Sequence, residues 1–201
     1  MWPFELSTLR EGDTGPGLLP PRLLAKVFTA TAALGLMLLW FKELPTLPLL
    51  LLAVATLLLV RQLILDLCHE TLLDIYNLPL AILGLIWAGV YGVGITQSLL
   101  GGVLGFGVSL GLSWVISRIK PGLSGLGGGD VKLLGVMGLW LGPLGLLLAF
   151  MLGNFINLAV ALIFNRSSLP QGPGLIIGLW VMLLWPNSLI HLFLMLAQRI
   201  S

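Results

Sequence analysis

The chain has 201 residues, of which 58% are hydrophobic and only 9% are charged, whereas about a quarter of the residues in soluble proteins are charged. This composition excludes a water-soluble globular protein and indicates an integral membrane protein. The net charge of +2 is spread thinly, and Cys68 is the single cysteine. A nucleic-acid partner, an internal disulfide and a multi-cysteine zinc cluster are therefore not expected.

Apolar segments long enough to cross a bilayer fill most of the chain. A spanning helix needs about 20 residues, so the length allows about six or seven crossings. The segments are expected to be helices, because backbone exposed to lipid must satisfy its own hydrogen bonds. The predicted fold class is all-α, a polytopic membrane protein with about six to seven transmembrane helices. The expected spans are 24–41, 47–66, 78–95, 98–117, 131–142, 144–164 and 174–197.

The domain prediction is a cytoplasmic amino-terminal tail at 1–22, followed by a transmembrane helical domain at 23–201. The tail lacks the basic-then-apolar order of a cleavable signal peptide. Lys and Arg precede the first span and flank the glycine-rich loop before Val131, so these segments are expected on the cytoplasmic side. Alternation of the spans then puts Asp66 and Asp130 at the same cytoplasmic face of the plasma membrane.

Small residues and one glycine-proline pair predict how two of the spans pack. A turn is expected at Gly142-Pro143, because the apolar run from Val131 to Phe164 is too long for one helix and too short for two full ones. The span at 98–117 carries small residues at four-residue spacing, which allows close helix approach. They are Gly101, Gly105, Ser109 and Ser113, and, beside them, Gly107 and Gly111.

Asp66 ends an otherwise apolar run, where a carboxylate is costly and indicates a functional site. The alternative is that Asp66 only ends the helix at the headgroups, paired with Arg61 or hydrogen-bonded to Gln62. Asp130 follows Gly127, Gly128 and Gly129, and glycines let the backbone approach a neighbour or an extended peptide closely. The alternative there is a flexible loop in which Asp130 caps a helix that starts at Val131.

Two aspartates from separate helices at one membrane face suggest an aspartic-protease dyad. One carboxylate takes a proton from water while the other protonates or hydrogen-bonds the scissile carbonyl. This chemistry needs neither a metal nor a cofactor. Serine and zinc hydrolysis are disfavoured, because no GxSxG surrounds a serine and "CHE" at 68–70 lacks a second zinc-binding histidine.

Three segments resemble the type IV prepilin peptidases, which are membrane aspartic proteases with a GxGD motif. The segment "GGGDVKLL" is similar to the GxGD segment, and "DLCHETLLDIYNLPL" to the first aspartate segment, with a second acidic residue at Asp74 and a helix restart around Pro79. "PQGPGLIIG" is similar to the segment that opens the last helix of the family, although Gln171 and Gly174 replace the usual phenylalanines. Leu73 replaces a common proline.

The resemblance implies that Asp66 and Asp130 are the catalytic pair, and that residues 23–201 form a peptidase domain. Gly127, Gly129, Lys132 and Asp74 are expected to shape the loop or bind substrate. The implied substrate is the leader of a prepilin or pseudopilin, cleaved on the cytoplasmic side. Only residues 42–46 separate the first two spans, so we expect a peptidase without the zinc-bound methylating domain of the larger members.

A second hypothesis is a non-proteolytic membrane protein, either a small carrier or a scaffold for pilus or secretion assembly, whose paired acids relay protons or bind an ion. The internal repeats common in transporters are not visible in the chain. The sequence does not identify the oligomeric state. The glycine run predicts that the two carboxylates lie apart at rest and close when substrate binds.

Overall fold

The computed structural model describes residues 45–69, 74–119, 127–163 and 171–185, together with Thr31, Ala33, Gly35 and Met37. The regular elements in these ranges are all helices, which confirms the all-α prediction for this part of the chain. They are α2 (Thr46–His69), α3 (Asp74–Val90), α4 (Ile95–Ile119), α5 (Gly128–Ile163) and α6 (Gly172–Leu184). The predicted tail at 1–22 lies outside the described residues, as does the first predicted span, 24–41, apart from the four single positions.

Three of the described helices are long and apolar enough to cross a membrane. Their candidate spans are Thr46–Asp66, Ile95–Ile119 and Gly128–Ile163, while α3 and α6 are apolar but shorter. The described part of the chain therefore does not confirm the predicted six to seven spans. Large apolar side chains on α4 point outward, for example Val103, which is 69% exposed, and Trp114, which is 62% exposed. Such a surface fits a lipid environment.

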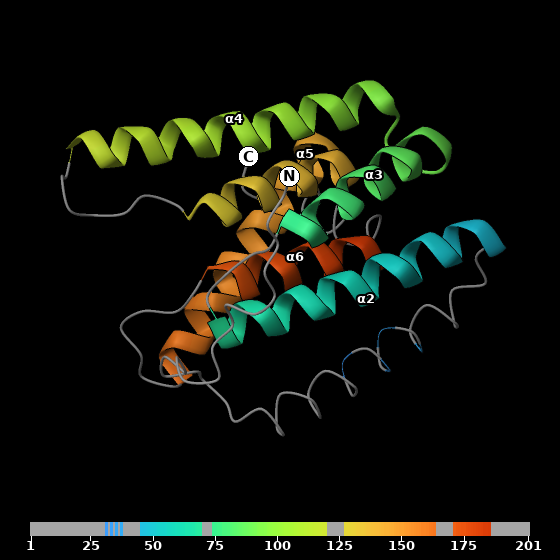
Figure 1. The fold of residues 1–201 in the computed structure, drawn as a ribbon, viewed down its shortest axis with the longest axis horizontal. Helices are drawn as coiled ribbons and strands as arrows, with labels where there is room; N and C mark the ends of the chain where they lie inside the picture. The colour runs from blue at the N-terminus through green and yellow to red at the C-terminus, as the bar shows by residue number, and fades with distance from the viewer. Residues whose placement is uncertain are drawn as a thin grey trace, which may run out of the picture.

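Two helices, α5 and α6, lie at the centre of the bundle. Figure 1 shows α4 along one side and α2 along the other, with α5 and α6 between them. The small-residue face of α4 packs on the first half of α5, where a Cβ added to Gly105 would lie 2.8 Å from the backbone carbon of Leu134. Gly101 likewise meets Gly138 backbone to backbone. The predicted close approach is confirmed at Gly101 and Gly105, and Ser109 is buried, whereas Gly107 and Gly111 have no described atom within 4 Å of an added Cβ.

The path of α5 changes at Gly142. Its backbone has φ 68° and ψ −177°, a region that only glycine adopts readily, and Pro143 follows. The first half of α5 packs on α4 through Gly138, and the second half packs on α6, where Gly153 meets Gly174. The predicted change of direction is therefore present at Gly142-Pro143. The two helices expected at 131–142 and 144–164 are therefore both present, and they follow each other directly across the non-helical Gly142 within α5.

The buried core joins α2, α3, α5 and α6. At its centre Trp140 is 1% exposed, and its Nε1 donates a hydrogen bond to the backbone oxygen of Leu80 at 2.8 Å. A Cβ added to Gly84 would lie 2.7 Å from Cδ1 of Trp140, so the indole fits only because residue 84 is glycine. These contacts fix α3 against the first half of α5.

The start of α3 differs from the prediction. The expected span began at residue 78 and the expected restart lay around Pro79, but α3 begins at Asp74 and Pro79 lies inside it. A carboxylate in the first turn stabilises a helix because the amino-terminal end of the helix dipole is positive. Asp74 supplies that charge, so the helix starts about one turn before the proline.

Candidate active site

Four helix ends meet at one end of the bundle. Gln62 near the end of α2 hydrogen-bonds Asn77 near the start of α3, and Lys132 near the start of α5 pairs with Asp74 in the first turn of α3. Gly172, the first residue of α6, packs against the side chain of Asp66. The carboxyl-terminal end of α2 and the amino-terminal ends of α3, α5 and α6 therefore surround the predicted site.

Asp66 is a buried carboxylate, 4% exposed, and it is the last residue of the apolar span Thr46–Asp66. A Cβ added to Gly172 would lie 2.7 Å from Cγ of Asp66, so the carboxyl group occupies space that a side chain at position 172 would fill. Pro173 follows at the start of α6 and fixes its first turn. The sequence placed Gly172 in a segment that resembles a family motif, but it did not predict this contact with Asp66.

The two polar residues considered as partners of Asp66 bond to α3. Nε of Arg61 donates to the hydroxyl of Tyr76 at 2.7 Å, and Nε2 of Gln62 donates to Oδ1 of Asn77 at 2.8 Å. Both contacts hold the end of α2 against the start of α3. The suggested pairing of Arg61 with Asp66 stays a prediction.

Asp130 lies in the first turn of α5 and does not cap a helix that starts at Val131. The helix begins at Gly128, and the backbone N–H of Val131 donates to the oxygen of Gly127 at 3.1 Å. The predicted boundary is wrong because the glycines after Gly127 already adopt helical geometry and supply the first turn. Oδ2 of Asp130 turns back toward Gly127 and would lie 3.3 Å from a Cβ at that position. Gly127 therefore leaves room for the carboxylate, whereas Gly129 is the helical residue just before it.

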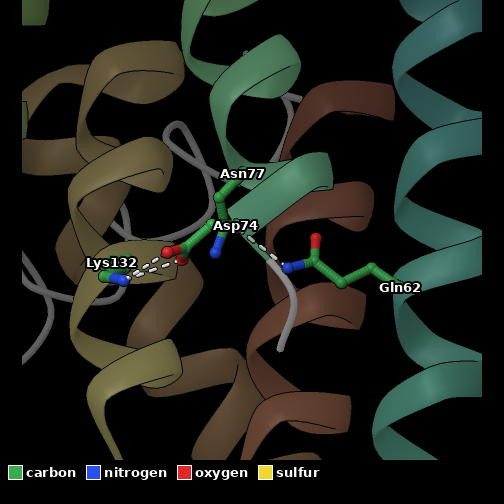
Figure 2. Close-up of polar contacts among 4 residues, drawn as sticks. All are labelled: Gln62, Asp74, Asn77 and Lys132. Carbon is green, nitrogen blue, oxygen red and sulfur yellow. Dashed lines mark hydrogen bonds and ion pairs between the residues drawn. The ribbon is translucent and has the colours of Figure 1, made fainter. Parts of the chain in front are cut away.

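The structure brings together two further predicted residues, Asp74 and Lys132. Nζ of Lys132 lies 2.6 Å from Oδ2 and 2.8 Å from Oδ1 of Asp74 (Figure 2). Both side chains are largely exposed, so the pair is open to solvent or headgroups. Because Lys132 follows Asp130 by two residues, this ion pair ties the start of α3 to the turn that carries Asp130.

The sequence did not predict the hydrogen bond between Gln62 and Asn77. Figure 2 shows Asn77 beside Asp74 on α3, facing Gln62 on α2. A signal was present for Gln62, which interrupts an apolar run four residues before Asp66 and so shares its helix face. No comparable signal marked Asn77, because it lies among other polar residues at a helix start.

Polar side chains on the second half of α5 hold the start of α6. Nδ2 of Asn157 donates to the backbone oxygen of Gln171, and Nε2 of Gln171 donates to Oδ1 of Asn154, both at 3.2 Å. Both hydrogen bonds join α5 to the residue that precedes α6. They position Gln171 and therefore Gly172, which contacts Asp66. Within the described ranges, no group of three or more His, Cys, Asp or Glu side chains is arranged to hold a metal ion.

Comparison with known proteins identifies what the chain is similar to. Residues 50–162 match the type IV leader peptidase family. The chain is 34% identical over 143 residues to the prepilin leader peptidase/N-methyltransferase of Pseudomonas aeruginosa. The aligned region covers 67% of this chain and 49% of that protein. The chain is also 34% identical over 137 residues to the protein of the same name from Aeromonas hydrophila, covering 64% of this chain and 47% of that protein. The chain spans about half the length of the curated relatives it matches. No solved structure matches significantly.

Proposed function

The chain belongs to the type IV leader peptidase family, and we propose that it is a membrane aspartic endopeptidase that removes the leader of prepilin-like proteins. One observation carries the proposal: a buried carboxylate, Asp66, ends an apolar span at the helix ends where the turn bearing Asp130 also lies. An acid buried at membrane depth is expensive and marks function. Family membership does not favour the carrier or scaffold alternative.

The proposed reaction is direct hydrolysis by the two carboxyl groups of Asp66 and Asp130. One carboxylate takes a proton from water as the water oxygen bonds to the scissile carbonyl carbon, while the protonated partner hydrogen-bonds the carbonyl oxygen. The tetrahedral intermediate then collapses, the C–N bond breaks, and a proton passes to the leaving amine. The products are a new carboxylate on the leader and a new amino terminus on the mature protein.

We place this end of the bundle at the cytoplasmic face. The Lys and Arg residues of the described helices are Arg61, Arg118 and Lys132. Arg61 and Lys132 lie at the helix ends that surround Asp66. Arg118 lies in the last turn of α4, which runs antiparallel to the first half of α5 and so ends on the same side of the bundle. Basic residues accumulate on the cytoplasmic side of membrane proteins. A substrate whose basic leader stays in the cytoplasm and whose apolar segment enters the bilayer would present its junction at this level.

The surrounding residues have supporting roles in the proposal. Gly127 and Gly129 let Asp130 move toward Asp66 when substrate binds, and the Asp74–Lys132 pair positions the turn that contains Asp130. The relatives are named for two activities, peptidase and N-methyltransferase. We propose that this chain performs the peptidase step alone, because only residues 42–46 separate the first two expected spans.

The function is tested with the purified chain in lipid nanodiscs and a full-length prepilin that keeps its leader and first apolar segment. We expect mass spectrometry to show one cut, at the junction between the leader and the apolar segment. The addition of S-adenosylmethionine should leave the new amino terminus unmethylated. A set of prepilins and pseudopilins that all stay intact with well-folded protein would contradict the peptidase assignment and favour a carrier or scaffold.

A further inference from the structure

A buried amide pair, Gln62 and Asn77, lies beside the proposed catalytic residues and has no part in the hydrolysis described above. Gln62 is 0% exposed and Asn77 is 5% exposed. One hydrogen bond joins them, from Nε2 of Gln62 to Oδ1 of Asn77 at 2.8 Å. Oε1 of Gln62 and Nδ2 of Asn77 have no hydrogen-bond partner among the described residues. Burying an amide oxygen or an amide N–H group without a hydrogen-bond partner destabilises the fold, so these two atoms need an explanation.

The hydrogen-bonding capacity of the pair does not depend on how the two amides are oriented. If both amides were turned over, Nδ2 of Asn77 would donate to Oε1 of Gln62, and one amide N–H group and one amide oxygen would still be open. The pair therefore presents one donor and one acceptor without partners among the described residues. Figure 2 shows the two side chains facing each other across the gap between α2 and α3.

The position of the pair relates it to the scissile bond. Gln62 precedes Asp66 by four residues on the same face of α2, which puts it about 6 Å further into the apolar span. Asn77 follows Asp74 by one turn of α3. A peptide that enters beside Asp66 on its way into the bilayer would thus meet the amide pair just on the membrane side of the cleavage point.

A substrate at that point has main-chain N–H and C=O groups that need hydrogen-bond partners. A peptide bond that is to be hydrolysed must be pulled out of helical hydrogen bonding, and the residues that follow it then expose backbone N–H and C=O groups near the hydrocarbon. Lipid cannot satisfy these groups. An extended peptide segment supplies one N–H and one C=O, which matches the open acceptor and donor of the amide pair.

We propose that Gln62 and Asn77 bind the unwound main chain of the substrate on the membrane side of the scissile bond. Gln62 accepts a hydrogen bond from a peptide N–H, and Asn77 donates one to a peptide C=O. This recognition does not depend on the substrate side chains at that point. The inference rests on the proposed function, which it deepens by naming the part of the substrate that is held.

The first test removes both amides together, with the double variant Gln62→Met and Asn77→Leu. Because no unsatisfied polar atom is then left buried, the melting temperature in detergent should be unchanged or higher. We expect kcat/KM for prepilin cleavage to fall about tenfold or more, because the variant loses two hydrogen bonds to the substrate main chain. The matched control is Thr56→Val. Thr56 is a buried polar residue on α2, like Gln62, but it lies ten residues before Asp66 and accepts a hydrogen bond from Nε1 of Trp180 on α6. This variant should keep the wild-type kcat/KM.

The second test identifies the substrate group and separates recognition from simple helix packing. Substrate peptides carry a single ester in place of one amide, placed in turn at each of the first residues after the scissile bond, so that one backbone N–H is lost. One ester should lower kcat/KM for the wild-type chain about tenfold and have almost no further effect on Gln62→Met. A merely structural Gln62 would instead give ester effects of equal size in both enzymes.

The outcomes are distinguishable. A double variant with a lower melting temperature and a proportionate loss of activity, or one with wild-type kcat/KM, would overturn the main-chain role, as would ester effects that are independent of Gln62. In each of these cases the wild-type chain still cleaves, and the proposed function stands. If the wild-type chain cleaves no prepilin, the proposed function fails and the main-chain role fails with it.

Discussion

Asp66 occupies a space that its neighbours leave free for a carboxyl group. The start of α6 approaches α2 so closely that residue 172 has room only for a hydrogen, since an added Cβ would lie 2.7 Å from Cγ of Asp66. The hydrogen bonds from Asn157 and Gln171 hold this start in place. The position of the buried acid is therefore set by a glycine on another helix as well as by α2 itself.

The Gly172→Ala variant tests this arrangement. The new methyl group should displace the carboxyl group by about 1 Å, and a misplacement of that size in a catalytic group lowers kcat on the order of 100-fold. Overpacking should also cost about 1–3 kcal/mol of stability. Cleavage kinetics and thermal melting of the purified chain measure both effects. As a control, Gly107→Ala adds a methyl group where no described atom lies within 4 Å and should be fully active, whereas a fully active Gly172→Ala would contradict the proposed contact.

At the scale of elements, α3 connects the helices that carry the two aspartates. It bonds to the end of α2 through Asn77 and Tyr76, and to the start of α5 through Asp74. Trp140 fixes its middle against α5. A change in α3 is therefore expected to alter how the turn with Asp130 approaches the end of α2.

Exchanging the charges of the Asp74–Lys132 pair tests this connection. Because an exposed ion pair contributes about 0.2–1 kcal/mol, Asp74→Asn or Lys132→Gln alone should slow cleavage by less than about tenfold. The double variant Asp74→Lys with Lys132→Asp restores an ion pair, so it should recover most of the activity. Steady-state kinetics of the four proteins decide the question. If Asp74→Asn abolishes cleavage and the exchange recovers nothing, the Asp74 carboxylate itself contacts substrate and is not a positioning residue.

Helix periodicity and hydropathy predicted the long elements well and their ends less well. The expected span at 98–117 corresponds to α4 at Ile95–Ile119, and the span at 47–66 lies within Thr46–His69. Pro79 misled the boundary of α3, since a proline is tolerated inside this helix while Asp74 supplies the favourable first-turn charge. The glycines before Asp130 were interpreted as a loop because glycine has a low helix propensity, whereas Gly128 and Gly129 form the start of α5.

At the scale of the whole molecule, the sequence supplied candidate functional residues but not their contacts. Asp66 and Asp130 stood out because acids are rare in apolar chains, and the direction of the spans predicted that they share a face. The contact of Gly172 with Asp66 and the pairing of Gln62 with Asn77 join residues far apart in sequence, so only the folded arrangement reveals them. The separation of the two carboxylates at rest stays a prediction.

The most direct measurement is single-turnover cleavage of a prepilin by the wild-type chain, Asp66→Asn and Asp130→Asn, reconstituted at equal concentration and with equal melting temperatures. The two-aspartate account predicts that the wild-type chain removes the leader and that each variant loses at least about 1,000-fold in rate, because the two carboxyl groups act as one unit. Cleavage within about tenfold of the wild-type rate by either variant would contradict the account, because that carboxyl group could not then be part of the chemistry.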